Sequence, residues 1–561
     1  MTRSVPVGEA RLLGDRAFLI GVADAAAART LAGELAPALA PDAEVVSGAA
    51  TVMVHATAAD AALGPMLELA AVLGEELRRR TPAGHVVEAG RVISIPCRFD
   101  GPDLGEVAAL AGVRPDAVAD LLTAHPLTAA VVGFSPGFAY LEGLPVPLQR
   151  VPRRARPRPA VAAGSVAIAN GYAAVYPTAS PGGWHLVGRT SFPLFSAARA
   201  PYALLAPGDR VQFTVAGVSD RSEPAPVAAP PWSLPAAARA VFEVVAPGLR
   251  AVVQDGGRRD VAASGVPATG PADPVSFELA NRLTGNGTGS GALELTGGGT
   301  RLRCLDSCHV AVVGADPEVR VDGTPERAGQ LLPLDAGQMV EIGRQRAGCR
   351  SYLAVSGGLL GPEWFGSAGT DELTGLGDGP LRAGDVLHAG EWAPPLGDHV
   401  VAGGSTDIDA SPSVVVELRV VAGPHAEHFA AAALTRLADT VFVAQPESNR
   451  VGVRLRPEAG AVGLREGTGG GGLDSQGVVT GAVQVPPDGD PVVLMPDHAT
   501  LGGYPVLAVV VAADHGRLGQ CAPGTRVRLV PITPAEADAA RRVARREVEH
   551  AVVGTFPLAV D

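Results

Sequence analysis

The chain has 561 residues, 47% of them hydrophobic, and a formal net charge of −13 with an isoelectric point near 5.4. The length exceeds a single hydrophobic core and predicts about three or four domains. The acidic balance argues against a nucleic-acid partner and an anionic membrane surface, because both require a basic face. All 45 basic residues are arginine, which excludes a Schiff-base lysine, a Walker A lysine and covalently attached biotin.

The sequence carries no sign of export or membrane insertion. The N-terminal stretch lacks the apolar core of a signal peptide, and no apolar run reaches the length of a membrane span. Five cysteines without a disulfide framework are typical of a reducing compartment, so we expect a soluble cytoplasmic protein. Cys304, Cys308 and His309 only superficially resemble a metal cluster, because they lie on a predicted strand, and we expect no metal site.

Residues 1–90 predict a small α+β domain with two alanine-rich amphipathic helices, near 23–39 and 57–80. The sequence pattern then changes. One helical stretch at 104–125 precedes short apolar runs separated by Gly and Pro. Short strands with dense turn signals are typical of a β-barrel or a sandwich, which we assign to residues 91–218.

Residues 219–240 are rich in Pro and Ala, lack periodicity and predict a linker. The predicted fold class is mainly β with α+β elements. Beyond the linker we expect two β-rich domains and a C-terminal helix with a tail, at 241–402, 403–532 and 533–561. Helices are predicted at 272–285, with Asp273 as the cap, and at 533–550, with Thr533 as the cap.

The stretch Gly133-Phe134-Ser135-Pro136-Gly137 fits the G-x-S-x-G pattern of a hydrolase nucleophile elbow. In such elbows the residue after the serine donates a backbone N–H to the oxyanion, and Pro136 has none. The region also lacks βαβ alternation. We therefore interpret the stretch as a turn with Pro136 and Gly137 at its central positions, and we do not assign Ser135 as a nucleophile.

A second Pro-Gly turn occupies residues 180–184. Gly182 and Gly183 allow close approach of the backbone to a ligand, and Arg189 can pair with a carboxylate or phosphate. The alternative is that both turns are barrel turns that carry core aromatic residues.

Other suggestive stretches do not form recognisable motifs. The glycines of 283–295 follow a helix and precede a strand, the reverse of the dinucleotide-binding order, and 467–477 lacks the lysine of a P-loop. His425 and His428 lie on a predicted helix, but nothing completes a metal site. We interpret both as surface histidines.

The stretch "LMPDHATLGGYPV" at 494–506 places Asp497 between an apolar run and a Gly-Gly turn. Asp497 can act as a base or metal ligand there, and the turn can bring backbone N–H groups to a substrate. On this interpretation Asp497→Ala abolishes turnover without unfolding the chain. A strand end with an Asx-type turn explains the pattern equally well.

Long motifs in a fixed order resemble a known family. "GFSPGFAYLEGL", "PRRARPRPAVAAGSVAIA" and "VYPTASPGGWHLVGRT" resemble the B subunit of 5-oxoprolinase, also called allophanate hydrolase subunit 1 or KipI-like. After the linker, "VQDGGRRDVAASGVPATGPADPVSFELANRLTGN", "SQGVVTGAVQVPPDGDPVVLMPDHATLGGYP" and "LGQCAPGTRVRL" resemble the C subunit, also called allophanate hydrolase subunit 2 or KipA-like. The resemblance covers about residues 5–530, and the chain looks like a B–C fusion.

The resemblance implies cyclophilin-like β-barrels, one behind the α+β domain in the B half and two in the C half. It implies a component of an ATP-dependent 5-oxoprolinase that uses ATP and Mg²⁺ to activate the lactam of 5-oxoproline, while a separate A subunit completes hydrolysis to glutamate. Two alternatives stay open: a carboxyltransferase acting on urea or a similar small amide with a separate biotin protein, and a Kip-type inhibitor of a histidine kinase. A homo-oligomer is also open.

The resemblance also implies two walls of a site. The implied nucleotide- or phosphate-binding residues are Arg189, Gly137, Gly182, Gly183, Trp184 and His125. The implied catalytic residues are Asp497 and Asn281, and the implied substrate-binding residues are Gln484, Ser475, Gly502, Gly503, Tyr504, Asp255, Arg258 and Ser264. Carboxamides suit amide recognition, because each offers a donor and an acceptor.

Three positions depart from the pattern of that family. It usually has Gln-Thr where this chain has Tyr172-Ala173, an arginine between two serines where this chain has Ala368-Gly369, and a basic residue where this chain has Val506. If those side chains contact phosphate or carboxylate, activity is altered or lost here.

Overall fold

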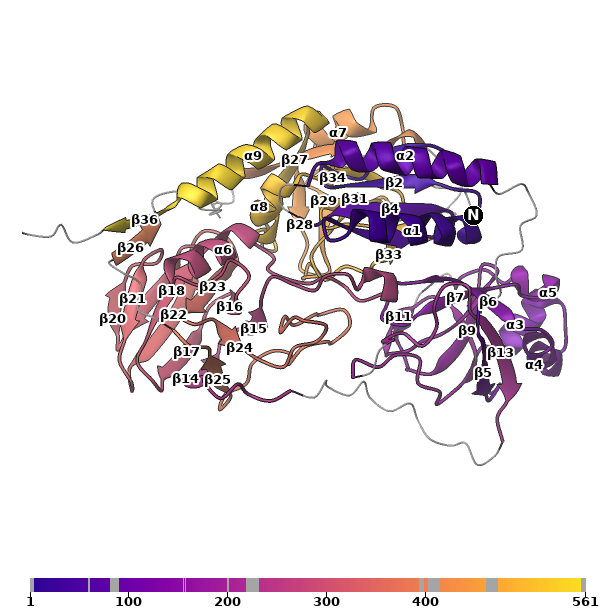
Figure 1. Cartoon of the computed structure of the whole chain (residues 1–561), viewed down its shortest axis with the longest axis horizontal. Coiled ribbons are helices and arrows are strands. Elements are labelled where there is room, and N and C mark those ends of the chain that lie inside the picture. Colours follow the sequence, from indigo (N-terminus) through magenta and orange to yellow (C-terminus); the bar gives the residue numbers. More distant parts are fainter. Residues whose placement is uncertain are drawn as a thin grey trace, which may run out of the picture.

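The computed structural model describes residues 5–58, 61–80, 90–154, 156, 158–198, 201–217, 232–392, 398–401, 414–460 and 473–555. Figure 1 shows the N-terminal α+β unit lying beside the last barrel of the chain, with two other β units below them. The expected mainly β fold with α+β elements is confirmed. No helix within the described ranges is long and apolar enough to cross a bilayer.

The N-terminal unit is an antiparallel sheet of strand order β1-β2-β4-β3 with two helices. Its elements are β1 (Ala10–Leu12), β2 (Ala17–Gly21), α1 (Ala25–Leu39), β3 (Ala43–Ser47), β4 (Thr51–Ala56) and α2 (Leu63–Arg80). Both predicted helices exist, although the second begins at Leu63 rather than near 57. Asp24 caps α1 by accepting from the Ala27 N–H, and Leu31 and Leu35 of α1 pack on Phe18 of the sheet.

The second unit is a sheet of order β12-β9-β10-β7-β6-β13-β5 with a separate β11-β8 pair. Its elements are β5 (Val92–Cys97), α3 (Leu104–Ala111), α4 (Pro115–Thr123), β6 (Leu127–Val132), β7 (Ala139–Glu142), α5 (Val146–Gln149), β8 (Arg158–Val161), β9 (Ser165–Ala169), β10 (Tyr172–Val175), β11 (Ser180–Gly182), β12 (His185–Arg189) and β13 (Arg210–Val215). The prediction of one helix over 104–125 is wrong. Gly112, at φ 68°, ends α3, and Pro115 begins α4.

The third unit stacks two sheets, of orders β20-β19-β22-β17-β14-β25-β24 and β15-β16-β23-β18-β21. Its elements are β14 (Arg239–Pro247), β15 (Arg250–Gln254), η1 (Ala262–Ser264), α6 (Pro274–Leu283), β16 (Ala292–Thr296), β17 (Thr300–Cys304), β18 (Cys308–Val313), β19 (Pro317–Val321), β20 (Thr324–Glu326), β21 (Leu331–Leu334), β22 (Met339–Gln345), β23 (Arg350–Val355), β24 (Leu359–Leu360) and β25 (Val386–Ala389). The predicted cap of α6 is confirmed, since Asp273 accepts from the Val275 and Ser276 N–H groups.

The last unit is a closed barrel of order β27-β34-β31-β32-β29-β28-β35. Its elements are β27 (Val415–Ala422), η2 (Ala426–His428), α7 (Ala433–Asp439), β28 (Phe442–Ala444), β29 (Gly452–Pro457), β30 (Gln476–Gly477), β31 (Ala482–Gln484), β32 (Val492–Leu494), β33 (Leu501–Gly502), β34 (Val506–Val510), η3 (Ala512–Asp514), α8 (His515–Gly519) and β35 (Arg526–Pro531). Helix α9 (Pro534–His550) follows, and its predicted Thr533 cap is confirmed as a capping box with Glu536.

Strand β26 (Asp398–Val401), after the third unit, pairs with β36 (Val552–Thr555) beyond α9. Most of the predicted linker lies at 218–231, and the expected boundary near 403–413 lies within 402–413. Both segments are outside the described residues.

The two ends of the chain pack together. Asp15 Oδ1 accepts from the Ala512 N–H at 3.0 Å, and Arg11 pairs with Glu427 at 2.6 Å. A Cβ on Gly14 would lie 2.9 Å from the side chain of Val509. One continuous hydrophobic cluster includes residues of the N-terminal unit, the second unit and the last barrel. The last barrel therefore has a core of its own and also packs residues such as Val506 and Val509 into a hydrophobic cluster with the first half of the chain.

Candidate functional site

The two halves of the chain meet at three loops, residues 133–137, 255–270 and 495–504. The Gly137 N–H donates to the Ser264 carbonyl at 3.0 Å, and a Cβ on Gly133 would lie 3.2 Å from Thr500 Oγ1. The junction brings Gly137 and Ser264, both predicted from the sequence, into direct contact. A site built here depends on both halves.

The predicted carboxamide of Gln484 lies beside the Gly-Gly turn of the last barrel. Gln484 Nε2 is 2.5 Å from the position that a Cβ on Gly502 would take, so only glycine leaves room for this amide. Among the described residues, Gln484 Nε2 has no hydrogen-bond partner. Gly503 accepts from the Leu473 N–H at 2.9 Å, and the ring of Tyr504 is partly exposed. The turn and the amide together form a surface that can donate to a carbonyl oxygen.

His425 is not the surface histidine predicted from the sequence. Its side chain is fully buried, and Nδ1 accepts from the Val506 N–H at 3.0 Å. Burial and the neighbouring His428 lower the pKa of His425 to about 3, so the ring is neutral and carries its proton on Nε2. Gln476 Nε2 lies 3.1 Å from His425 Nε2. Two N–H groups cannot bond each other, so exchanging the oxygen and nitrogen of this amide would let the oxygen accept from the His425 ring.

Both carboxylate oxygens of Asp497 are hydrogen-bonded, and the residue is ion-paired with Arg450. Its Oδ1 accepts from Thr269 Oγ1 at 2.5 Å and from Arg450 Nη2 at 2.9 Å. Its Oδ2 accepts from Arg450 Nε and from the Glu372 N–H, both at 2.9 Å. With no exposed surface and both oxygens bonded, Asp497 holds loops together in this structure. We therefore expect Asp497→Ala to destabilise the fold, unlike the expectation from the sequence.

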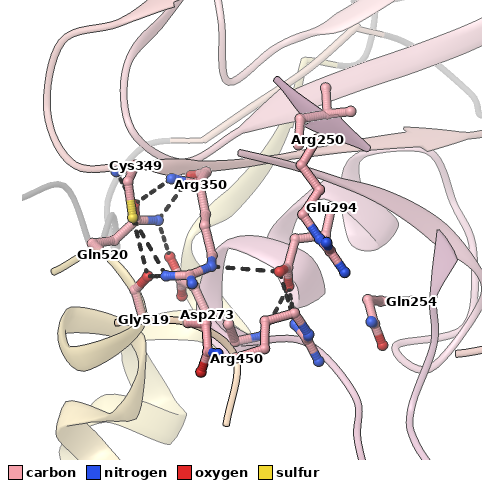
Figure 2. A network of polar contacts seen from close by, with 12 residues as sticks. Arg250, Gln254, Asp273, Glu294, Cys349, Arg350, Arg450, Gly519 and Gln520 are labelled. Atoms are coloured by element: carbon pink, nitrogen blue, oxygen red, sulfur yellow. Dashed lines mark hydrogen bonds and ion pairs between the residues drawn. The ribbon is translucent and has the colours of Figure 1, made fainter. Parts of the chain in front are cut away.

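Arg450, the partner of Asp497, also belongs to a network of polar contacts between the third unit and the last barrel, shown in Figure 2. Arg450 Nη1 donates to both oxygens of Glu294, at 2.7 and 2.8 Å. Gln520 accepts from the N–H groups of Cys349 and Arg350, and it donates to Asp273 Oδ2 and the Arg350 carbonyl. These contacts join the two units of the second half into one body.

Asp255 and Arg258 fix a loop that runs from Trp364 to Glu372. Asp255 accepts from Ser367 Oγ at 2.6 Å and from the Ala368 N–H at 2.7 Å. Arg258 donates to the carbonyl oxygens of Trp364 at 3.1 Å and Gly369 at 2.6 Å. Both predicted residues thus act on one segment next to the junction.

Asp371, which the sequence did not point to, lies in that same loop. It is 1% exposed, and its Oδ1 accepts from the N–H and the hydroxyl of Thr374, both at 2.6 Å. Burial, followed by the charge of Asp497, raises the pKa of Asp371 to about 7. An Asp in a Gly- and Thr-rich loop has no sequence signal that distinguishes it from a turn residue.

The other predicted residues lie in several places. Asn281 in α6 is buried, donates to the Ser290 carbonyl and accepts from Asn286 Nδ2. Arg189 is exposed and pairs with Asp100 at 2.8 Å, and His125 is exposed beyond the end of α4. The carbonyl of Ser475 accepts from the Ala49 N–H of the N-terminal unit at 2.8 Å.

The second Pro-Gly turn belongs to an aromatic cluster. Trp184 packs edge-to-face on Phe138 with ring centroids 5.7 Å apart, and the Tyr176 ring fills the space where a Cβ on Gly182 would lie. Gly183 accepts from the Arg154 N–H at 2.8 Å. The predicted phosphate-binding residues therefore do not form a single set of donors.

Comparisons with known proteins cover both halves. Residues 6–205 match the family described as "Carboxyltransferase domain, subdomain C and D", and residues 264–531 match "Carboxyltransferase domain, subdomain A and B". The C subunit of 5-oxoprolinase from Escherichia coli K12 is 33% identical over 312 residues, which are 55% of this chain and 97% of that protein. The chain belongs to the family of 5-oxoprolinase B and C subunits.

Further relatives support the fusion of a B half and a C half. The B subunit of 5-oxoprolinase from Escherichia coli O157:H7 is 44% identical over 143 residues, or 25% of this chain and 65% of that protein. The crystal structure of TTHA0988 is 33% identical, with a TM-score of 0.78 over 92% of this chain and 99% of that one. Urea amidolyase from Lachancea kluyveri is 31% identical over 52% of this chain but only 17% of its own length.

Two histidines with lowered pKa values, one in each half, predict that the fold loses stability in acid. Burial lowers the pKa of His55 in the B half to about 4, with contributions from Arg16, His498 and His515, and that of His425 in the C half to about 3. A lowered folded-state pKa means that stability is complete above the ordinary value near 6.5 and falls as the pH drops toward these values. We expect the free energy of unfolding to fall by up to about 1.4 kcal/mol per pH unit for each histidine.

Urea unfolding at pH 7.5, 6 and 5 checks this expectation, with His55→Gln as the variant that should show a shallower dependence. Equal free energies of unfolding at the three pH values would show that these histidines are not buried as neutral groups.

Proposed function

We propose that this chain is the fused B–C component of an ATP-dependent 5-oxoprolinase and that it prepares the lactam of 5-oxoproline for hydrolysis with a separate A subunit. The observation that carries the proposal is the similarity of the two halves to proteins named as the B and C subunits of 5-oxoprolinase, in one polypeptide. The shared hydrophobic cluster and the Gly137–Ser264 contact support a permanently assembled pair.

The predicted nucleotide site does not fit the described residues. Arg189 and His125 are exposed, Arg189 is paired with Asp100, and the Gly137 N–H is already bonded to Ser264. Within the described ranges, no three His, Cys, Asp or Glu side chains are grouped to hold a metal ion. We therefore assign no step of the reaction to ATP or Mg²⁺ on these residues.

The proposal is tested by incubating the purified chain with 5-oxoproline, ATP and Mg²⁺, with and without a matching A subunit. The expected result is ADP and glutamate in the complete mixture and no glutamate without the A subunit. No ADP and no glutamate in any combination would exclude the oxoprolinase function.

A carboxyltransferase function is the second candidate, because both matched families are described as carboxyltransferase subdomains and a urea amidolyase is a relative. The chain has no lysine for biotin, so this function requires a separate biotin protein. Transfer of labelled carboxyl from a carboxylated biotin carrier to urea, without any glutamate formation from 5-oxoproline, would establish it instead.

Substitution of Ser135 tests directly whether this residue is a catalytic nucleophile. Its hydroxyl is buried without a hydrogen-bond partner among the described residues, and Pro136 cannot donate to an oxyanion. We expect Ser135→Ala to keep most of the glutamate formation and to change the free energy of unfolding by less than about 1 kcal/mol. Complete loss of turnover in a folded Ser135→Ala protein would restore the elbow interpretation.

A further inference from the structure

Five buried side chains in or around the loop of residues 364–377 carry polar atoms that have no hydrogen-bond partner among the described residues. One is the ring N–H of Trp364, and the other four belong to side chains that reach residues 369–371. Each of these four side chains is at least nine-tenths buried. Their unpartnered atoms are Gln254 Oε1, Arg258 Nη1, Thr370 Oγ1 and Asp371 Oδ2. Buried polar groups are normally bonded to something, so a group of four such atoms requires an explanation.

The four side chains meet at one short stretch of backbone, residues 369–371. Gln254 Nε2 donates to the Thr370 carbonyl at 2.7 Å, and its Oε1 is 3.0 Å from the position of a Cβ on Gly369. Arg258 Nη2 donates to the Gly369 carbonyl at 2.6 Å. Gln254 and Arg258 therefore both reach the segment that carries Thr370 and Asp371.

Asp371 is held so that one oxygen stays available. Thr374 donates twice to Oδ1, which leaves Oδ2 as the unpartnered atom. Burial and the charge of Asp497 raise the pKa of Asp371, while the hydrogen bonds from Thr374 and the charge of Arg258 lower it.

The mixture of unpartnered atoms decides what class of ligand fits. Arg258 Nη1 donates, Gln254 Oε1 accepts, Thr370 Oγ1 does both, and Asp371 Oδ2 accepts when ionised. An anion would meet the oxygens of Asp371 and Gln254, and a cation would meet the Arg258 guanidinium. A neutral planar group with a C=O and an N–H side by side satisfies donors and acceptors together, and an amide is such a group.

We propose that Gln254, Arg258, Thr370 and Asp371 bind the neutral amide group of a small molecule, with its carbonyl toward Arg258 and Thr370 and its N–H toward Asp371 and Gln254. The choice of a lactam as the natural ligand rests on the proposed function. The site is distinct from the surface at Gln484 and Gly502.

The B half supports this loop of the C half. Phe365 packs edge-to-face on Tyr202 with ring centroids 4.4 Å apart, and Trp364 and Leu376 share a hydrophobic cluster with Phe195. The loop is thus held from both sides. Because the four atoms are buried, a ligand can reach them only if the loop shifts, and the packing of Phe365 against Tyr202 opposes such a shift.

Thr370→Val gives the sharpest test, because valine keeps the shape of threonine and removes only the unpartnered hydroxyl. Calorimetry on the full chain, without ATP or the A subunit, measures the affinity for 2-pyrrolidinone, 5-oxoproline and urea. We expect Thr370→Val and Asp371→Asn each to weaken lactam binding at least tenfold. Thr324→Val, an exposed threonine on β20, should bind like the unmodified chain.

The outcomes separate this site from the proposed function. Lactam affinity that is unchanged in folded Thr370→Val and Asp371→Asn overturns the site, as does the absence of any lactam or urea binding by the unmodified chain. Lactam binding that both variants weaken supports the site even where the oxoprolinase assay gives no glutamate. Binding of urea alone, weakened in both variants, supports an amide site and overturns the lactam as its ligand.

Discussion

Replacing Arg450 with alanine is expected to lower the free energy of unfolding by about 3–5 kcal/mol. Arg450 is the shared partner of Glu294 in the third unit and Asp497 in the last barrel, and all three side chains are buried. Without the guanidinium, two carboxylates remain in the interior without their cation. Removing one partner of a buried ion pair is costly for this reason, whereas replacing the whole group with apolar residues need not be. Urea denaturation followed by circular dichroism measures the change.

Arg454→Ala is the matched control, because Arg454 lies in the neighbouring strand β29 with its side chain exposed. We expect it to change the free energy of unfolding by no more than about 0.5 kcal/mol. A loss below about 1 kcal/mol in Arg450→Ala would mean that the network of Figure 2 is open to water. The same measurement is required for Asp497→Ala before any loss of turnover is attributed to catalysis.

Gly265→Ala is expected to disrupt the junction between the halves. A Cβ on Gly265 would overlap the backbone oxygen of Ser135, and Gly265 has a φ of +78°, which favours glycine. The overlap is with backbone, so it is relieved only if the loop at 133–137 moves away. We expect a drop in the free energy of unfolding of about 2 kcal/mol or more and at least a tenfold loss of glutamate formation in the complete oxoprolinase mixture.

Gly285→Ala separates the effect of backbone strain from the effect of the steric overlap with Ser135. Gly285 has a similar φ of +73°, but an added Cβ there meets no atom within 4 Å. It therefore reports the cost of backbone strain alone, about 1 kcal/mol. Equal effects of the two substitutions on stability and turnover would show that contact between the halves at Ser135 contributes nothing.

Local signals in the sequence predict local structure well. Asp273 and Thr533 cap helices because each needs only N–H groups within three residues, and both caps are present. The prediction of a single helix over 104–125 is wrong, although the signals for the break are also local. Gly112 ends one helix and Pro115 begins the next, but the continuous apolar periodicity suggested one helix. The long resemblance supplies the family, which no single motif would have given.

The candidate site is harder to predict because its partners are far apart along the chain. Thr269 and Asp497 are separated by 228 positions, and Arg450 and Glu294 by 156. The turn around Asp497 marks it in the sequence, yet two of its partners, Thr269 and Glu372, come from the third unit. The spacing of His425 suggests a surface position on a short helix, but its burial depends on Val506 and Gln476. No pattern of neighbours in the sequence reveals that Asp371 is buried with one oxygen that has no partner among the described residues.

The packing of the N-terminal unit against the last barrel bears on why B and C halves occur both as separate subunits and as one chain. The contacts of Arg11 and Asp15 with the barrel are the kind that two independent proteins can make. A covalent link between such partners adds no contact of its own; it raises the effective concentration of one partner around the other. Fusion in this protein therefore keeps the two halves in equal number and close together, while the contacts between them come from their own surfaces.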